Sequence, residues 1–161
     1  MKAAPTQGRQ AHGLRIAILR ALFNQQVTDG LLRGAREALA ELGADLRRIQ
    51  VIDVPGAFEL PLVAQAAARS RRFDAIVALG AVIRGETDHY EHIAREAAAG
   101  LAAVARETGV PVGFGVLTVR RAAHALARSR RTGDNKGREA ARAAVFTVHA
   151  LRALRARGRR S

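Results

Sequence analysis

The sequence predicts one α/β domain, a three-layer sandwich in which a four-stranded parallel sheet is covered by helices on both faces. Four short apolar runs alternate with longer stretches of helical periodicity, and such alternation favours parallel strands joined by helices. The length of 161 residues, 48% of them hydrophobic, suits a single core. We expect this domain to span residues 13–157, between a flexible segment over residues 1–12 and a basic tail over residues 158–161.

The strands are expected where apolar residues follow one another closely. They occupy residues 14–19 (LRIAIL), 48–54 (RIQVIDV), 74–79 (DAIVAL) and 112–117 (VGFGVL). Near-continuous apolar runs are typical of parallel strands that helices bury from both sides.

The helices are expected between and after these strands. In residues 27–43, Leu31, Ala35 and Leu39 are spaced like one face of a helix, and Gly43 predicts its end. Similar patterns predict helices over residues 58–69, 90–108 and 135–157, and a shorter one over residues 122–129.

The composition excludes several classes of protein. Cysteine is absent, which rules out disulfides, thiolate metal sites and catalysis by a thiol. No apolar run approaches the roughly 18–20 residues that span a bilayer, and the first residues hold no hydrophobic segment of signal-peptide type. We therefore expect a soluble, cytoplasmic protein without membrane association.

The positive charge is concentrated in the last quarter of the chain. The formal net charge is +13, and residues 120–161 hold thirteen Lys or Arg against two acidic residues. Such a segment attracts nucleic acid or other polyanions. Phe146 is the only aromatic residue there, whereas proteins that recognise RNA sequence usually stack bases on several. Nucleic acid is therefore expected to bind only nonspecifically.

The segments that follow the first three strands contain the residues that suggest a ligand site. In parallel sheets of this kind, ligands bind beyond the carboxyl ends of the strands. The chain has six aromatic residues; Phe23, Phe58 and Tyr90 fall in these segments, and Phe114 falls on the fourth predicted strand. This clustering predicts a flat, partly polar ligand.

Five motifs in order carry a resemblance to a known family. They are FN (23–24), VPGAFELP (54–61), ALGAVIRGET-x-HY (78–90), FGVLT (114–118) and DNKGREAA (134–141). With these motifs the chain resembles the 6,7-dimethyl-8-ribityllumazine synthases over nearly its whole length. The resemblance implies a flavodoxin-like fold and an activity in riboflavin biosynthesis: condensation of 5-amino-6-(D-ribitylamino)uracil with 3,4-dihydroxy-2-butanone 4-phosphate. It also implies that no metal or organic cofactor takes part, and that active sites are shared between neighbouring subunits of a ring of five.

The residues expected to bind the aminouracil come from four segments. Phe23 would stack on the pyrimidine, although a core residue is the other interpretation of a phenylalanine here. Gly56 would allow a tight turn, after which backbone amides donate to substrate oxygens. The resemblance assigns these contacts to Ala57, Phe58 and Glu59, with the Glu59 carboxylate on ribityl hydroxyls, and further contacts to Ala81, Val82, Ile83 and, from the adjacent subunit, Phe114. Without the resemblance, residues 55–61 are an ordinary strand-to-helix turn.

His89 is expected to transfer protons. An imidazole titrates near neutrality, which suits a reaction that forms an imine, expels phosphate and closes a ring. In the family this histidine is the general acid/base, whereas alone it could merely begin a helix and bind backbone. His92 lies one turn further on, but a metal site would need a third ligand, so we interpret it as structural.

The keto-phosphate requires an anion site. Glu86 and Thr87 belong to the turn before a helix, where backbone N–H groups favour phosphate. The resemblance assigns the matching charge to Arg128, whose guanidinium can grip phosphate with two hydrogen bonds. The Glu86 side chain is expected to point away, and Lys136 is left outside the primary site.

The chain departs from the family pattern mainly after FGVLT. Arg121, His124, Arg128 and Arg131 would form one cationic stripe if residues 121–131 were helical. Leu22 also replaces the arginine that usually precedes Phe-Asn. Three explanations are open: drift in an Arg-rich proteome, a natural surface for an acidic partner, and an engineered surface.

Assembly and two other functions complete the expectations. The shared site predicts a homo-pentamer, with an icosahedral shell or cage of twelve pentamers as the larger form. The weak apolar alternation of residues 5–12 and the cationic stripe favour free pentamers unless an acidic second component covers the stripe. The alternatives are a catalytically idle self-assembling scaffold and a flavin- or polyanion-binding protein.

Overall fold

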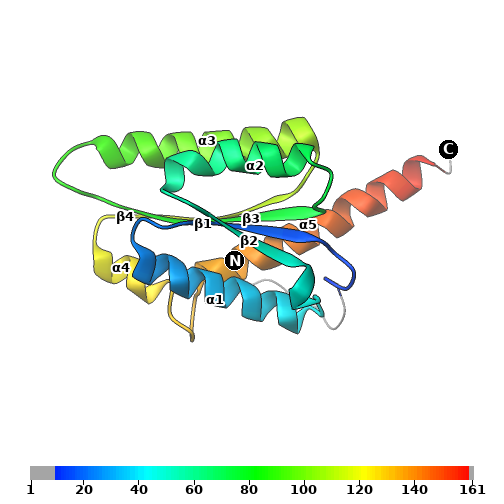
Figure 1. The fold of residues 1–161 in the computed structure, drawn as a ribbon, viewed down its shortest axis with the longest axis horizontal. Helices are drawn as coiled ribbons and strands as arrows, with labels where there is room; N and C mark the ends of the chain where they lie inside the picture. The colour runs from blue at the N-terminus through cyan, green and yellow to red at the C-terminus, as the bar shows by residue number, and fades with distance from the viewer. Residues whose placement is uncertain (1–9, 160–161) are drawn as a thin grey trace.

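A computed structural model describes residues 10–159 as a four-stranded parallel sheet between two layers of helices (Figure 1). The strands are β1 (Ile16–Ala21), β2 (Ile49–Val54), β3 (Ala75–Ile83) and β4 (Val112–Val119), in the order β2-β1-β3-β4. The helices are α1 (Gln25–Glu41), α2 (Leu60–Arg69), α3 (His89–Thr108), α4 (Ala122–Ala127) and α5 (Lys136–Gly158), with short 3-10 turns at Leu46–Arg48 and Ala57–Glu59. This parallel order is that of a flavodoxin-like sheet, so the predicted fold class is confirmed.

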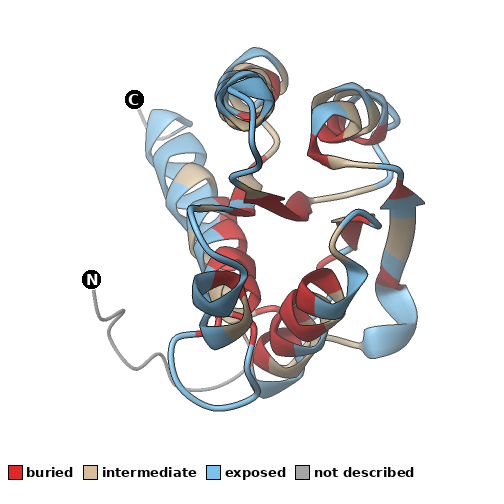
Figure 2. Cartoon of the chain, turned by 90° about the vertical axis from the view of Figure 1, so that its left-hand side faces the viewer, coloured by how far each residue is buried: buried red, intermediate tan, exposed pale blue. Residues whose placement is uncertain are grey.

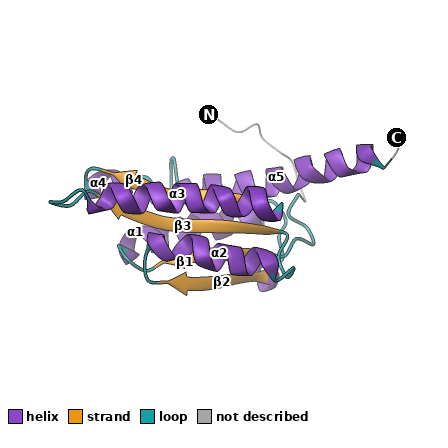
Figure 3. Ribbon diagram, turned by 90° about the horizontal axis from the view of Figure 1, so that it is seen from above, coloured by secondary structure: helices purple, strands orange, loops and turns teal. Residues whose placement is uncertain are grey.

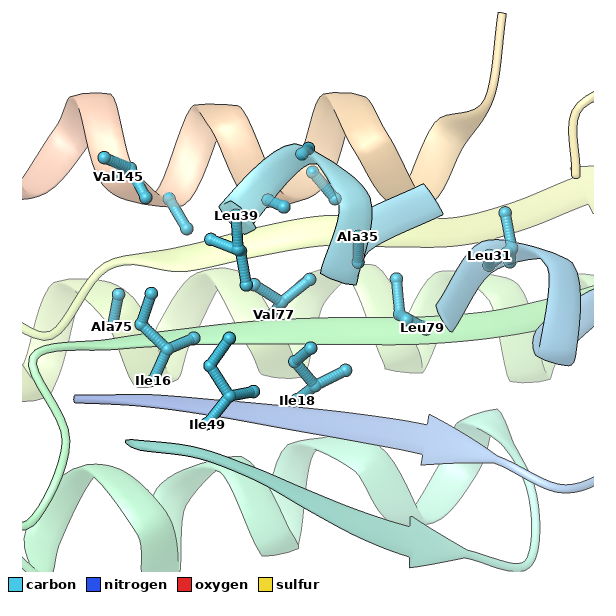
Figure 4. Close-up of a cluster of buried hydrophobic side chains, with 14 of the residues drawn as sticks. Ile16, Ile18, Leu31, Ala35, Leu39, Ile49, Ala75, Val77, Leu79 and Val145 are labelled. Carbon is cyan, nitrogen blue, oxygen red and sulfur yellow. The ribbon is translucent and has the colours of Figure 1, made fainter. Parts of the chain in front are cut away.

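The two faces of the sheet bury separate apolar layers. Helices α2 and α3 cover one face, while α1, α4 and α5 cover the other (Figures 1 and 3). The central strands β1 and β3 and the inward faces of the helices are mostly buried, whereas the edge strands β2 and β4 and the outward faces of the helices carry exposed residues (Figure 2). In the layer under α1 and α5, Leu31 and Leu39 pack towards Val77 and Leu79 of the central strand β3 (Figure 4).

Strands β3 and β4 are longer than the apolar runs predicted. β1 pairs with β3 only as far as Leu79, whereas β4 pairs with β3 up to Ile83. Residues 80–83 therefore belong to the sheet and have one open edge, where β1 has already ended.

Helices α1 and α5 approach each other closely through glycine. A Cβ atom at Gly137 would collide with the backbone of Leu31, so a larger residue there would force the two helices apart. The predicted end of α1 is also confirmed, since Gly43 adopts a left-handed φ of 83° just after the helix.

Helix α4 differs from the prediction of a helix over residues 122–129. It ends at Ala127, Arg121 precedes it in extended conformation, and Arg131 lies in the following turn, where it pairs with Glu37. The expected helical stripe is therefore wrong, because the chain turns after Arg128 in order to enter α5. The cationic side chains of residues 121–131 spread over a turn instead.

The flexible segment expected over residues 1–12 and the basic tail expected over residues 158–161 lie partly outside the described residues, which exclude 1–9 and 160–161. Within them, Ala11 is buried and its N–H donates to the Leu42 carbonyl at 2.9 Å, so packing reaches two residues before the expected boundary. Among residues 10–159, even the longest helices, α3 and α5, lack the apolar stretch needed to cross a membrane.

Candidate active site

A pocket of about 300 Å³ lies at the carboxyl ends of β1, β2 and β3. β1 has β2 on one side and β3 on the other, and the helices that follow β1 and β2 lie on opposite faces of the sheet. This change of direction leaves an opening beyond the strand ends, where parallel α/β folds bind ligands. The pocket is lined by Phe23, Asn24, Gly56, Ala57, Phe58, Glu59, Ala81, Val82, Ile83, His89, Tyr90 and Ile93.

The turn after β1 presents an aromatic ring to this pocket. Phe23 is 74% exposed, so it is not the core residue that the alternative interpretation proposed. Its N–H donates to the Pro55 carbonyl at 3.0 Å, which fixes the backbone beside the second turn. The next residue, Asn24, is left-handed (φ 59°), and its Nδ2 donates to the Ala81 carbonyl at 2.9 Å. Asn24 therefore holds the Phe23 turn against β3.

The turn after β2 supplies a carboxylate and free amides. Glu59 Oε2 accepts a hydrogen bond from the Gly56 N–H at 3.0 Å, which orients the carboxylate and leaves Oε1 available. Ala57 and Phe58 begin the 3-10 turn, so their N–H groups have no earlier carbonyl to bind, whereas the Glu59 N–H donates to the Gly56 carbonyl. The chain does turn at Gly56, but with a φ of −148° it is extended, a conformation that any residue can adopt. A Cβ there would instead lie 3.3 Å from the Glu59 carboxylate.

The open edge of β3 offers backbone groups to the pocket. The Arg84 N–H donates to Val119 on β4, whereas the Ala81 carbonyl points the other way, towards Asn24. Because backbone groups alternate between the two edges of a strand, those of Ala81 and Ile83 face the opening and those of Val82 face β4.

His89 begins α3 and lines the pocket. Its ring is exposed and makes no hydrogen bond with any residue from 10 to 159, so no backbone group fixes it as the alternative interpretation required. Tyr90 follows it, and the Arg84 guanidinium lies 5.9 Å from the centre of the Tyr90 ring. A cation therefore stands beside the loop that was expected to bind phosphate.

An ion-pair network fixes the strand ends beside the pocket. The Arg20 side chain on β1 is 15% exposed and bonds Asp53 on β2 at 2.8 Å as well as Asp29 on α1. The hydrogen bond from Arg20 holds the pKa of Asp53 below its usual range, against the opposing effect of burial. The network ties β1, β2 and α1 together where the first two turns begin.

Four expected site residues do not line this pocket. Glu86 and Thr87 lie in the exposed loop between β3 and α3, while Phe114, 46% exposed, lies on the edge strand β4. Arg128 lines a separate hollow of about 330 Å³ beyond the carboxyl end of β4. Within one chain, the pocket at the ends of β1, β2 and β3 and the hollow that contains Arg128 are therefore separate parts of the expected site.

The second hollow is cationic. It is lined by residues 116–119 together with Arg120, His124, Arg128 and Lys136. Lys136 was left outside the predicted site, yet it shares this hollow with Arg128, and its Nζ bonds Glu139 at 2.7 Å. The Lys136 N–H also donates to the Arg128 carbonyl at 2.9 Å, which sets the spacing of the two cations.

Sequence reasoning missed Ile93 in the first pocket, and it gave no role to Asn24 or Tyr90, although both lie in the segments and motifs that it singled out. Asn24 had a usable signal, because an asparagine in the turn between a strand and a helix is suited to left-handed backbone. Among residues 10–159, no group of three His or carboxylate side chains is placed to hold a metal ion.

Comparisons with known proteins agree with this geometry. A family model described as 6,7-dimethyl-8-ribityllumazine synthase matches residues 13–152. The chain is 51% identical over 141 residues to 6,7-dimethyl-8-ribityllumazine synthase 1 of Caulobacter vibrioides, an alignment covering 88% of this chain and 92% of that protein. The matched residues include every segment of both hollows, and the chain therefore belongs to the 6,7-dimethyl-8-ribityllumazine synthase family.

Proposed function

We propose that this chain catalyses the condensation of 5-amino-6-(D-ribitylamino)uracil with 3,4-dihydroxy-2-butanone 4-phosphate in riboflavin biosynthesis. The observation that carries the proposal is the first pocket. There an exposed phenyl ring, an oriented carboxylate, an open strand edge and an unengaged imidazole meet at one opening. Membership of the family gives this arrangement its substrates.

Each part of the pocket has a role for the aminouracil. The Phe23 ring stacks on the flat pyrimidine. The backbone of Ala81 and Ile83 and the amides of Ala57 and Phe58 bind its polar edge, and Glu59 Oε1 accepts hydrogen bonds from ribityl hydroxyls.

The keto-phosphate binds beside it. The backbone of Glu86 and Thr87 and the guanidinium of Arg128 hold the phosphate, because N–H groups and a fork of donors both match its oxygens. Arg128 and Phe114 come from a neighbouring subunit. Their position on the β4 side of the chain, outside the pocket that they would have to complete, supports this part of the proposal.

The reaction then needs positioning and proton transfer. The amine of the uracil attacks the ketone and water leaves as an imine forms. Phosphate is eliminated from the four-carbon unit, and the ribityl-bearing nitrogen closes the second ring as another water leaves. His89 moves protons in these steps, while holding two substrates together replaces a bimolecular encounter.

A turnover assay tests this function directly. The purified chain, given both substrates, should form the fluorescent lumazine and release inorganic phosphate in equal amounts. An idle scaffold would give neither product. A flavin- or polyanion-binding protein would bind its ligand and leave the keto-phosphate unconsumed.

The proposed assembly is a homo-pentamer, which supplies the neighbour that the site needs. Residues 5–9 of the segment that bears on shell formation lie outside the described residues. The cationic residues of 121–131 do not form one helical stripe. Any repulsion between neighbouring pentamers would therefore come from these residues as they are spread over the turn around Arg128.

A further inference from the structure

A second surface lies at the opposite edge of the sheet, where the strands begin. Arg15 directly precedes β1, Arg47 and Arg48 precede β2, and Arg72 and Phe73 lie just before β3. The last turns of α5 reach the same edge, since Arg152 and Arg155 line a hollow with Phe73 and with residues 108–111, just before β4. We call Arg15, Arg47, Arg48, Arg72, Arg152 and Arg155 the amino-edge arginines.

The amino-edge arginines form one continuous surface. A hollow of about 510 Å³ is lined by the first four of them, and a hollow of about 240 Å³ by the last two. Phe73 lines both hollows. The Asp74 carboxylate bridges them, with Oδ1 3.3 Å from Arg15 and 3.8 Å from Arg152.

The positive charge of this surface is only partly neutralised. Asp74 pairs with Arg15 and Arg152, and Asp45 pairs with Arg47. Arg48, Arg72 and Arg155 are exposed and have no carboxylate partner anywhere in residues 10–159. The Arg72 side chain donates to the neutral Gln50 amide at 3.1 Å, and no carboxylate among residues 10–159 compensates its charge.

Helix α5 extends the surface away from the domain (Figures 1 and 3). Arg152, Arg155 and Arg159 are spaced three and four residues apart, so they lie on one face of the helix end. The match to the family ends at residue 152. Arg155 and Arg159 therefore lie outside the part of the chain that the family model covers.

We propose that the amino-edge arginines bind the phosphodiester backbone of nucleic acid without reading its sequence. The surface uses arginine throughout, and the guanidinium fork matches phosphate oxygens better than the ammonium of lysine does. It offers no free stacking platform for bases, because its one aromatic ring, Phe73, already has the Arg72 guanidinium 5.4 Å from its centre. Of the large apolar side chains on the described end of α5, only Leu154 is exposed, which is too little for a membrane surface.

The test measures binding of a short fluorescein-labelled single-stranded RNA by anisotropy across a sodium chloride series. The logarithm of the association constant should fall linearly with the logarithm of the salt concentration. Each phosphate neutralised on a single strand contributes about −0.7 to the slope, so three uncompensated arginines predict a slope of about −2. Combined Arg48→Gln, Arg72→Gln and Arg155→Gln should weaken binding at low salt at least about tenfold and flatten this slope. A matched control, Arg33→Gln with Arg95→Gln and Arg130→Gln, removes the same charge from exposed positions without an ion pair among residues 10–159.

The outcomes separate a site from overall charge. The proposal holds if only the amino-edge variant loses RNA affinity and if its turnover equals that of the unaltered chain, since the catalytic pocket lies at the other edge of the sheet. Equal losses in both triple variants would overturn it, because the net charge alone would then explain binding. Binding to inorganic polyphosphate or to anionic vesicles but not to RNA would also overturn it.

Discussion

His89 is the single residue on which the proposed chemistry depends most. Its ring is exposed in the pocket and unengaged among the described residues, so His89→Ala should leave the fold intact. Turnover should fall by about tenfold to a thousandfold, since general acid/base catalysis contributes on that order while substrate positioning survives. His92→Ala is the matched control, because His92 is exposed but does not line the pocket. Steady-state kinetics measure this effect. Unchanged turnover in a folded His89→Ala variant would show that His89 takes no part in the mechanism.

Arg128 is the side chain to which we assign binding of the phosphate group. Arg128→Ala should raise the KM for the keto-phosphate far more than that for the aminouracil, because only the keto-phosphate carries a phosphate dianion. Arg130→Ala serves as the control for charge alone, since Arg130 does not line the cationic hollow. If both KM values rose equally, the assignment of phosphate binding to Arg128 would be wrong.

Most residues of the first pocket could be predicted from the sequence, whereas contacts between distant residues could not. Eight of the predicted residues, from Phe23 to His89, line one pocket, because each follows or ends a strand at the same edge of the sheet. The left-handed turn at Asn24 could have been expected, but its hydrogen bond to Ala81 could not, since that bond joins residues far apart in the chain. The position of Lys136 beside Arg128 in the cationic hollow could not be predicted either. The turn after Arg128 brings Lys136 there, and local periodicity does not encode that turn.

At the scale of elements, Asn135 joins α5 to α1. It is buried, its Oδ1 accepts the Arg138 N–H as the helix cap, and its Nδ2 donates to the carbonyls of Gly30 and Arg130 at 3.1 and 2.9 Å. Asn135→Ala should lower the free energy of unfolding by about 2–4 kcal/mol, because a cap is lost and buried carbonyls are left unpaired. Urea unfolding measures this, with the exposed Asp134→Ala as control. A loss no larger than that of the control would contradict it.

Asp74 joins β1, β3 and α5 through charge. Burial opposes its ionisation, but hydrogen bonds from Arg15 and the charge of Arg152 outweigh this and hold the Asp74 pKa below its usual range. A lowered pKa in the folded chain adds stability above the unfolded value of about 3.9, and that stability is lost as pH falls through the folded value. Asp74→Asn should therefore cost about 1 kcal/mol at neutral pH and progressively less in acid. Urea unfolding of Asp74→Asn and of the unaltered chain, at neutral and at acid pH, measures this cost. A loss of unfolding free energy that grows in acid would contradict the prediction.

The elements themselves were predictable because strand and helix patterns differ clearly in this chain. All four strands and all five helices occur where expected, since the strands are near-continuously apolar and the helices carry a buried stripe. The ends were harder to predict. β3 continues to Ile83 because β4 pairs with it there, and α4 stops at Ala127 because the chain must turn into α5.

At the scale of the whole molecule, the two parts of the site predict an assembly. Light scattering should give a pentamer as the smallest species, because the proposed site combines the pocket of one chain with the β4 side of another. At low salt, repulsion around Arg128 should keep pentamers separate, and it should weaken as salt rises. A shell of pentamers that persists at low salt without a partner would contradict this, and a monomer that turns over substrate would contradict the shared site.

Complementation between two impaired variants, assayed at a keto-phosphate concentration well below the KM of Arg128→Ala, tests the shared site most directly. His89→Ala and Arg128→Ala alter different parts of the site, and the account places these parts in different chains of one active site. When the two variants are co-expressed in equal amounts, random assembly pairs an intact His89 with a neighbour's intact Arg128 in about a quarter of the sites. The account predicts turnover near a quarter of that of the unaltered chain. Turnover equal to the mean of the two separate variants would show that each chain builds its site alone.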